Sequence, residues 1–422
     1  MRGDRFDVVV VGASLAGCTA ATLYARQGLS VALVESHRDP AHYKRACTHF
    51  IQSTAWPVIR RLGMAEAIME AGGRPNRLSI WTRWGWLEFP GGVDAPVDGD
   101  QRAADEGAAD TGVNIRRSAL DPMLRAHTGA EPNVTMLMGQ RVSDVVVRAG
   151  RVVGVRASGG GREQEFFGRL VVGADGRTSK VAECAGQPSV TKPHGRFVYF
   201  APFTGVGLPD EASRMWLLEP DVAYAFPNGE VTILSVMPTA DRLAEFRKDL
   251  RGNYLEHLRR LPHGPDLSAA EQVGELSGVL NYICVSRRPA APGLALIGDA
   301  AMTSDYMWGT GCSFAFQSAA WLVDATASAL LRAGDVDPGL RRYAARHRQV
   351  LAGHHRLMSD YADGRGFNPM ERLLYAAAVR DPRLARHVVE FGERRMSVRK
   401  FLSPNMVMRS LLVNRPQSAV AA

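Results

Sequence analysis

The chain has 422 residues, of which 46% are hydrophobic and 22% are charged, as in an ordinary globular protein with room for two or three subdomains. No stretch offers 18 uninterrupted apolar residues, so we expect no transmembrane segment. The net charge is +8, but the basic residues are dispersed rather than clustered, which argues against nucleic-acid binding. A positive field would still attract anionic small molecules.

The five cysteines are widely scattered and odd in number, and none forms a C-x-x-C pair. This pattern argues against a disulfide framework and against a metal site, and it favours a reducing, cytoplasmic setting. The segment Leu15-Ala-Gly-Cys18 resembles a lipoprotein cleavage site, but Asp4 and Asp7 are unlike the basic leader that such a site requires.

The first forty residues predict a strand, a glycine turn, a helix and a second strand. Residues 8–11 are all valine, which suits a buried parallel strand, and residues 15–27 have the composition of a helix. Residues 31–35 form the second strand, which ends in Glu35. This order is typical of a dinucleotide-binding unit, in which the helix directs its free N–H groups at a pyrophosphate.

Each residue of the turn has an expected role in that unit. Gly12 permits the tight turn, Gly17 allows close packing of helix on strand, and Ser14 replaces the usual middle glycine. Glu35 follows Gly12 by 23 residues, near the spacing at which an acid reaches a ribose hydroxyl. The candidate binding residues here are Gly12, Ala13, Ser14, Ala16, Gly17 and Glu35.

The middle of the chain alternates between strands and loops. Residues 78–89 are rich in aromatic residues and predict a hairpin, residues 96–111 predict a mobile surface loop or lid, and a helix begins at Arg117. Residues 142–147 and 152–157 predict a second hairpin, and residues 166–172 return to the parallel sheet. Residues 197–237 predict an antiparallel sheet inserted as a second domain.

The last third begins with a buried strand at residues 294–297 and a long apolar helix at 313–331. Residues 339–412 are helical, with breaks near Gly364, Pro369 and Pro382. Within them, residues 394–415 are the only candidate for contact with an anionic membrane surface, although a packed surface helix is favoured.

We therefore expect an α/β fold with a Rossmann-like domain of the glutathione-reductase type, an inserted antiparallel sheet domain and a C-terminal helical region. The dinucleotide-binding domain is expected to be discontinuous, with residues 1–77, 112–185 and 276–335. The sheet domain would hold residues 78–111 and 186–275, and the helical region residues 336–422.

Two further motifs support the dinucleotide-binding site that the N-terminal motif predicts. A strand ends in Gly173-Ala-Asp175-Gly176, and Gly298-Asp299 follows the strand at 294–297. Gly309-Thr-Gly311 then opens the long helix. Each is common alone, but their order and spacing after the N-terminal motif are not expected of a random chain.

With these motifs, residues 6–335 resemble the p-hydroxybenzoate hydroxylase-like flavoproteins. These include single-component FAD monooxygenases and, more distantly, geranylgeranyl reductases and flavin halogenases. The resemblance implies that the first motif holds the ADP half of FAD, that Asp175 lies near the pyrophosphate and the NAD(P)H path, and that Gly298 and Asp299 bind the ribityl and pyrophosphate groups. It also implies FAD contacts for Arg45 and Arg117, and the helix dipole near Gly309 and Gly311 would stabilise a reduced flavin.

Three departures from the hydroxylase pattern put a simple phenol hydroxylase in doubt. Met302 replaces a histidine, Tyr306 a proline and Ser313 an asparagine. Ser318 resembles the reductase and halogenase branch, and Cys47 lies near a functional cysteine of geranylgeranyl reductases. No halogenase Trp-x-Trp-x-Ile-Pro motif occurs.

Three functions stay open from the sequence. The favoured one is an NAD(P)H- and O₂-dependent monooxygenase acting on an aromatic or polyketide-like small molecule in bacterial natural-product biosynthesis. The second is an FAD-dependent reductase or dehydrogenase of the geranylgeranyl-reductase type, acting on a double bond without oxygen, and the third is a non-catalytic flavoprotein. Candidate residues of the substrate pocket are Tyr224, Phe226, Tyr306 and Trp308, with Tyr306 also a candidate proton donor. The sequence does not indicate the oligomeric state.

Overall fold

A computed structural model describes residues 4–87 and 111–415 and divides the chain into two compact units. Unit 1 comprises Met1–Gly73, Ile115–Pro193 and Ile283–His355, and unit 2 comprises Arg74–Asn114, His194–Tyr282 and Arg356–Ala422. The helices after residue 336 are thus divided between the two units. The loop predicted at residues 96–111 lies outside the described residues except for Thr111.

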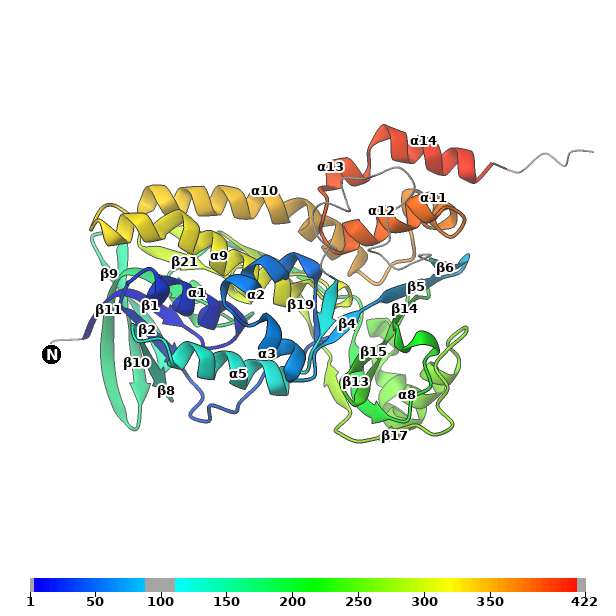
Figure 1. Ribbon diagram of the computed structural model, residues 1–422, viewed down its shortest axis with the longest axis horizontal. Coiled ribbons are helices and arrows are strands. Elements are labelled where there is room, and N and C mark those ends of the chain that lie inside the picture. Colours follow the sequence, from blue (N-terminus) through cyan, green and yellow to red (C-terminus); the bar gives the residue numbers. More distant parts are fainter. Residues whose placement is uncertain (1–3, 88–110, 416–422) are drawn as a thin grey trace, which may run out of the picture. The chain divides into compact units, whose positions relative to one another are not determined.

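The core of unit 1 is a parallel sheet in the order β21-β11-β1-β2-β8 (Figure 1). Successive side chains along its strands point to opposite faces of the sheet, and both faces are buried, as a Rossmann-like sheet requires. Val9 and Val11 pack against the hairpin of β9 and β10, whose side chains include Val145 and Val155. The strands are β1 (Asp4–Val11), β2 (Val31–Glu35), β8 (Val134–Met138), β9 (Arg141–Arg148), β10 (Arg151–Gly159), β11 (Arg162–Gly173) and β21 (Leu294–Leu296).

Helices α1 and α9 pack together in unit 1, and α5 packs on α1. Helix α10 is fixed to the sheet because the Tyr343 hydroxyl donates to the Leu296 carbonyl at 2.6 Å. A separate small sheet has the strand order β12-β19-β22. The bounds are α1 (Leu15–Arg26), α2 (Trp56–Arg61), α3 (Ala65–Glu70), α5 (Arg117–Gly129), α6 (Lys180–Cys184), α9 (Thr310–Leu331), α10 (Asp337–Tyr361), β3 (Phe50–Ile51), β12 (Ser189–Pro193), β19 (Ile283–Arg287), β20 (Ala290–Ala291) and β22 (Met302–Thr303).

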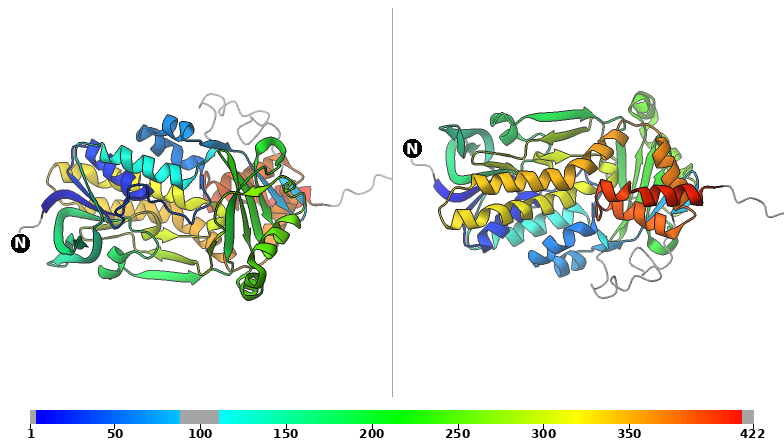
Figure 2. Two further views of the ribbon diagram at one scale, coloured as in Figure 1. Left: turned by 90° about the horizontal axis from the view of Figure 1, so that it is seen from below. Right: turned by 90° about the horizontal axis from the view of Figure 1, so that it is seen from above.

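Unit 2 contains the second large sheet, in the order β17-β13-β16-β15-β14-β5-β6 (Figure 2, left). Its pairings are antiparallel as predicted, except that β5 and β14 run parallel. Helix α8 covers one face, where Tyr254 and Leu258 join Trp216 in a buried cluster. The bounds are β4 (Arg74–Asn76), β5 (Leu78–Thr82), β6 (Gly85–Leu87), β7 (Gly112–Asn114), β13 (Val198–Thr204), β14 (Ser213–Leu217), β15 (Val222–Asn228), β16 (Val231–Met237), α7 (Leu243–Phe246), α8 (Leu250–Arg259), β17 (Glu271–Gln272) and β18 (Ser277–Val279).

Two C-terminal helices of unit 2 begin at Pro369 and Pro382, where breaks are predicted, and a further one begins at Pro404. The helices α11 (Pro369–Ala378), α12 (Pro382–Gly392) and α14 (Pro404–Val413) each have proline in the first turn, and α13 (Val398–Phe401) precedes α14. Proline suits this position because the first N–H groups of a helix have no intrahelical partner.

One helix of the described chain, α9, is long and apolar enough to cross a membrane by length and composition, and 67% of its apolar window is buried within the protein. The core helix of a globular domain meets the same criteria, so this is weak evidence for a membrane span.

Candidate functional site

The turn between β1 and α1 has the close packing that its glycines predict. Gly12 has φ +102°, and a Cβ there would lie 2.5 Å from the carbonyl oxygen of Ala174. A Cβ on Gly17 would lie 1.7 Å from the Gly12 oxygen. Only glycine fits at either position, and the first motif therefore touches the second at Ala174.

The beginning of α1 is held from β2 and α5. The Ala13 N–H donates to Glu35 Oε2 at 2.7 Å, and the His37 N–H donates to Glu35 Oε1 at 2.8 Å. The Ala13 carbonyl accepts from Arg125 Nη1 at 3.0 Å. Glu35 therefore lies beside the turn, as the ribose-binding prediction requires, while also fixing the backbone there.

Asp175 fixes the second motif. Its Oδ1 accepts from the Ser179 hydroxyl at 2.6 Å, and its Oδ2 accepts from the Val181 N–H at 3.0 Å. Burial raises the pKa of Asp175, and these hydrogen bonds oppose that shift. Both oxygens are thus engaged at the beginning of α6, so Asp175 shapes the turn around Gly176, which has φ +81°.

The third motif meets the first at Gly298. A Cβ on this residue, which has φ +56°, would lie 2.9 Å from the Cβ of Ala16. The Gly298 N–H donates to Ser318 Oγ at 2.9 Å, and the Ser318 hydroxyl donates to the Phe314 carbonyl. Ser318 therefore secures the turn of Gly298 on α9.

Asp299, the next residue, forms an ion pair that the sequence did not predict. Its Oδ2 lies 2.6 Å from Lys44 Nζ, and its side chain is 19% exposed. The Asp299 carboxylate raises the pKa of Lys44, which keeps the amine charged. A Cβ on Gly311 would lie 3.7 Å from Asp299 Oδ1, so the opening of α9 also faces this carboxylate.

Arg117 lies almost fully buried at the beginning of α5. Its guanidinium donates to both oxygens of Asp121, at 2.7 and 2.9 Å, and Nη2 also donates to the Ser14 hydroxyl at 2.8 Å. Burial alone would lower the pKa of Arg117, but Asp121 raises it, so the group stays charged. The i,i+4 spacing of Arg117 and Asp121 is a sequence signal that would have indicated this pair.

Two cysteines lie beside the same guanidinium. Cys47 and Cys312 have their sulfur atoms 3.8 Å apart, and Arg117 Nη1 lies 3.8 and 3.9 Å from them. The His49 N–H donates to Cys47 Sγ at 3.3 Å. The hydrogen bond between the two sulfur atoms lowers the pKa of Cys47, helped by the charge of Arg117, and raises the pKa of Cys312.

The loop before α9 contains Tyr306 and Trp308. Gly309 has φ +61°, and a Cβ there would lie 2.5 Å from Phe50 Cδ1. The Trp308 carbonyl accepts from Gln52 Nε2 at 3.1 Å. The Trp308 indole nitrogen is buried, and among the described residues it has no hydrogen-bond acceptor. A buried donor of this kind is suited to a bound group.

The other predicted site residues are Arg45, which follows Lys44 in the chain, and two aromatic residues of unit 2. Arg45 is exposed in the segment between β2 and β3. Tyr224 and Phe226 are buried on β15 in unit 2, with ring centroids 4.4 Å apart, while Ala223 and Ala225 face the cluster under α8. They therefore lie on the opposite face of that sheet.

The family of the chain follows from a comparison with known proteins. Residues 5–354 match the family model described as an FAD binding domain. The chain belongs to this FAD-binding family. Its membership confirms the predicted superfamily, the α/β fold and the assignment as an FAD-dependent oxidoreductase.

Relatives of this FAD-binding chain include two reductases. A digeranylgeranylglycerophospholipid reductase of Methanothrix thermoacetophila is 28% identical over 358 residues, which cover 82% of this chain and 84% of the relative. The menaquinone reductase of Mycolicibacterium smegmatis is 28% identical over 330 residues and covers 74% of each chain. A solved flavoprotein/dehydrogenase from Cytophaga hutchinsonii has the same fold, with a TM-score of 0.75, 17% identity and coverage of 97% of this chain and 98% of that one.

The residues of unit 1 fit FAD. The free N–H groups at the beginning of α1 suit a pyrophosphate, and the Asp299 carboxylate suits the hydroxyl groups of a ribityl chain. The Trp308 N–H offers a donor that has no acceptor among the described residues. Among those residues no cluster of three or more His, Cys, Asp or Glu side chains has the arrangement of a metal site.

Proposed function

We propose that this FAD-binding oxidoreductase is a reductase that adds hydrogen across a carbon–carbon double bond of a largely apolar organic substrate. NAD(P)H is the proposed electron donor. The observation that carries the proposal is the pair of thiols, Cys47 and Cys312, beside Arg117 and Ser14. FAD, when bound, supplies two-electron redox chemistry.

The thiol pair favours hydride transfer over oxygen chemistry. Peroxides oxidise cysteine thiolates to sulfenic acids, and Cys47 has the lowered pKa that makes a thiol susceptible. An enzyme that activates oxygen at each turnover would therefore expose these two thiols to oxidation. Met302, Tyr306 and Ser313 agree with this interpretation, since they replace residues of the hydroxylase pattern.

The other residues of the cluster bind and orient the cofactor. Arg117 holds Ser14 at the beginning of α1, and Asp299 with Lys44 provides an acceptor and a cation on the ribityl side. Saturation of a double bond needs a proton as well as a hydride. In this proposal Cys312 Sγ holds that proton and Cys47 Sγ accepts the hydrogen bond from it.

The relatives support a lipid-like substrate. Both are reductases by name, one acting on a digeranylgeranylglycerophospholipid and the other on menaquinone. We infer an unsaturated, isoprenoid-type compound as the substrate class. The Trp308 N–H, which has no acceptor among the described residues, would donate to a carbonyl of that compound or of FAD.

An anaerobic assay tests this function. Purified holoprotein, NADPH and a menaquinone or polyprenyl alcohol are incubated without oxygen, and the product is measured by mass spectrometry. We expect a gain of two hydrogen atoms in the isoprenoid chain, not in the quinone ring, per turnover. Cys47→Ser and Cys312→Ser should each reduce the rate at least tenfold with FAD retained, whereas the buried control Cys284→Ser should not. Turnover that requires stoichiometric oxygen would contradict the proposal.

The second candidate is an NAD(P)H-dependent monooxygenase acting on an aromatic or polyketide-like compound in natural-product biosynthesis. The aromatic face of the unit 2 sheet, with Tyr224 and Phe226, favours an aromatic substrate. Tyr306 is then the candidate proton donor. Substrate-dependent oxygen uptake with incorporation of one labelled oxygen atom would identify this activity.

A further inference from the structure

Helix α14 in unit 2 has one face that no other described element covers. Its three exposed apolar side chains are Met408, Leu411 and Leu412, which are 61%, 52% and 53% exposed. They are spaced i, i+3, i+4 and so share one side of the helix. Leu402, which is 38% exposed, precedes the helix. In Figure 2 (right), α14 lies in front of the other C-terminal helices.

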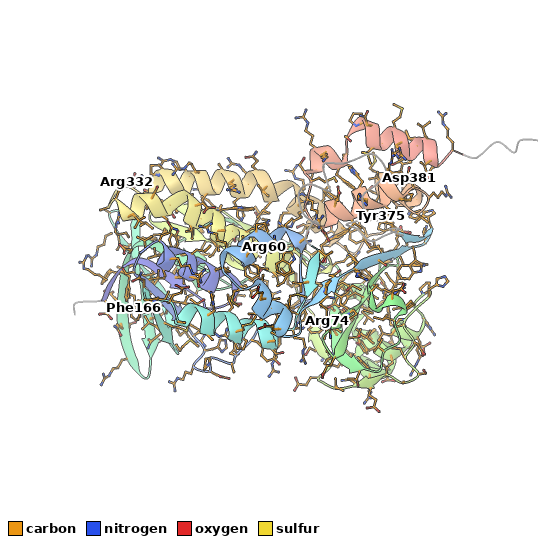
Figure 3. All side chains as sticks on the ribbon, in the orientation of Figure 1. Arg60, Arg74, Phe166, Arg332, Tyr375 and Asp381 are labelled. Carbon is orange, nitrogen blue, oxygen red and sulfur yellow. The ribbon has the colours of Figure 1, made fainter. Side chains whose placement is uncertain are left out.

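The opposite face fixes the orientation of α14 within unit 2. Arg409 forms an ion pair with Asp381 at the beginning of α12, at 2.5 Å, and Asp381 is labelled in Figure 3. The Asn414 side-chain amide donates to the Leu373 carbonyl of α11 at 2.9 Å. Ser410, two positions after Met408 and so on the far side of the helix, is fully buried, and the apolar side is therefore directed away from α11 and α12.

The C-terminal segment that contains this apolar face is rich in basic residues. Residues 394–415 contain six arginine or lysine residues and no acidic residue. Arg399 and Lys400 on α13 and Arg415 after α14 are exposed, and the exposed Arg380 donates to Asn414. Asp381 is buried against Arg409, so its charge is already compensated.

We propose that the surface formed by Leu402, Met408, Leu411 and Leu412, with Arg399, Lys400 and Arg415 around it, docks this protein on an anionic lipid bilayer. An apolar helix face bordered by cations lies in the plane of the interface, with its apolar side chains among the acyl chains and its cations at the lipid phosphates. A ten-residue helix is too short to span the bilayer, so the contact is peripheral.

The charge pattern favours an anionic bilayer, rather than another copy of this chain, as the binding partner of this surface. Two copies that met through α14 would bring two clusters of cations together, which is unfavourable, whereas an anionic membrane surface attracts each cation. The proposal does not depend on the reaction catalysed. Its failure would leave the proposed reductase activity untouched.

Vesicle sedimentation tests the docking surface with the full-length, FAD-loaded protein. We expect binding to vesicles of phosphatidylcholine with one quarter phosphatidylglycerol, much weaker binding to pure phosphatidylcholine, and a decline as salt is raised. The double variants Leu411→Ser with Leu412→Ser, and Arg399→Gln with Lys400→Gln, should each weaken binding about tenfold or more.

The matched control variants replace exposed apolar or basic residues that lie outside the proposed docking surface. Val190→Ser with Val147→Ser alters two exposed apolar residues of unit 1, and Arg251→Gln with Arg259→Gln removes two exposed cations of α8. These variants should bind vesicles like the wild type. FAD content verifies that every variant is folded.

Three outcomes would overturn the proposal. They are no vesicle binding by the wild type, equal binding to neutral and anionic vesicles, and binding that the α14 variants leave unchanged. A concentration-dependent dimer that the Leu411→Ser, Leu412→Ser variant dissociates, without vesicle binding, would assign the face to a second copy instead.

Discussion

Asp299 is the residue on which the third motif depends, because its carboxylate is the acceptor beside the opening of α9. Asp299 forms an ion pair with Lys44 through one oxygen, and Gly311, which has no side chain, lies beside the other. Hydrogen bonds to a charged group typically contribute about 1.5–3 kcal/mol. The FAD affinity should therefore depend strongly on this side chain.

We predict that Asp299→Ala weakens FAD binding roughly 10- to 100-fold. The purified variant should be colourless or pale yellow, and the flavin content is measured by absorbance. Asp324→Ala is the control, because Asp324 forms an exposed ion pair with Arg61 on the outer part of α9. Full FAD occupancy in Asp299→Ala would show that the ribityl-side motif is misassigned.

The roles of some site residues could be predicted from the sequence, whereas those of others could not. Gly12, Gly17 and Gly298 could be predicted because their roles depend on the local backbone. Lys44 could not, because its partner Asp299 lies 255 positions away. The pairing of Cys47 with Cys312 was also hidden, since these residues come from a loop and from the opening of α9. The proposed cofactor contact of Arg45 stays a prediction.

At the scale of elements, the β1–α1 turn is the strongest test of the dinucleotide site. Gly12 and Gly28 flank the unit formed by this turn and α1, and both have positive φ, +102° and +86°. A Cβ on Gly12 would meet the Ala174 backbone, whereas one on Gly28 would meet nothing within 4 Å. Substitutions at the two glycines can therefore be compared to separate the cost of backbone strain from the cost of steric conflict.

Gly12→Ala should lower the free energy of unfolding by about 3 kcal/mol or more and should abolish FAD binding. Gly28→Ala should cost about 1 kcal/mol, the strain alone, and should retain FAD. Chemical denaturation and flavin content measure both effects. Equal stability of the two variants would mean that the turn relaxes and that close packing against Ala174 is not required.

Elements predicted from local patterns agree with the structure. The valine run became β1, the aromatic segment at 78–87 became the hairpin of β5 and β6, and prolines mark the beginning of α11 and α12. The parallel pairing of β5 with β14 was not predicted, because it joins strands more than 130 residues apart. Periodicity reports which faces are buried but not which strands become neighbours.

At the scale of the whole molecule, buried histidines connect stability to pH. His347 on α10 packs against Tyr343, and burial lowers its pKa from 6.5 to about 4, with a further contribution from His355. The unfolded chain binds a proton at His347 at a higher pH than the folded chain does. Its contribution to stability is therefore present above pH 6.5 and is lost as the pH falls toward 4.

We predict that the wild type loses about 2 kcal/mol more stability between pH 7 and pH 5 than His347→Gln does, in proportion to the pKa shift. Urea denaturation at both pH values measures the difference, and acidic side chains contribute equally to both proteins. A parallel decline of the two proteins would show that His347 titrates normally in the folded state.

The sequence by itself determined the class of cofactor and the architecture of unit 1, because short segments of backbone bind nucleotides through local turns and helix ends. It also determined where most helices and strands lie. Only the tertiary structure decided that Arg117, Ser14, Cys47 and Cys312 form one cluster and that α14 keeps an apolar face uncovered. Those features depend on which distant segments pack together, which side-chain periodicity does not encode.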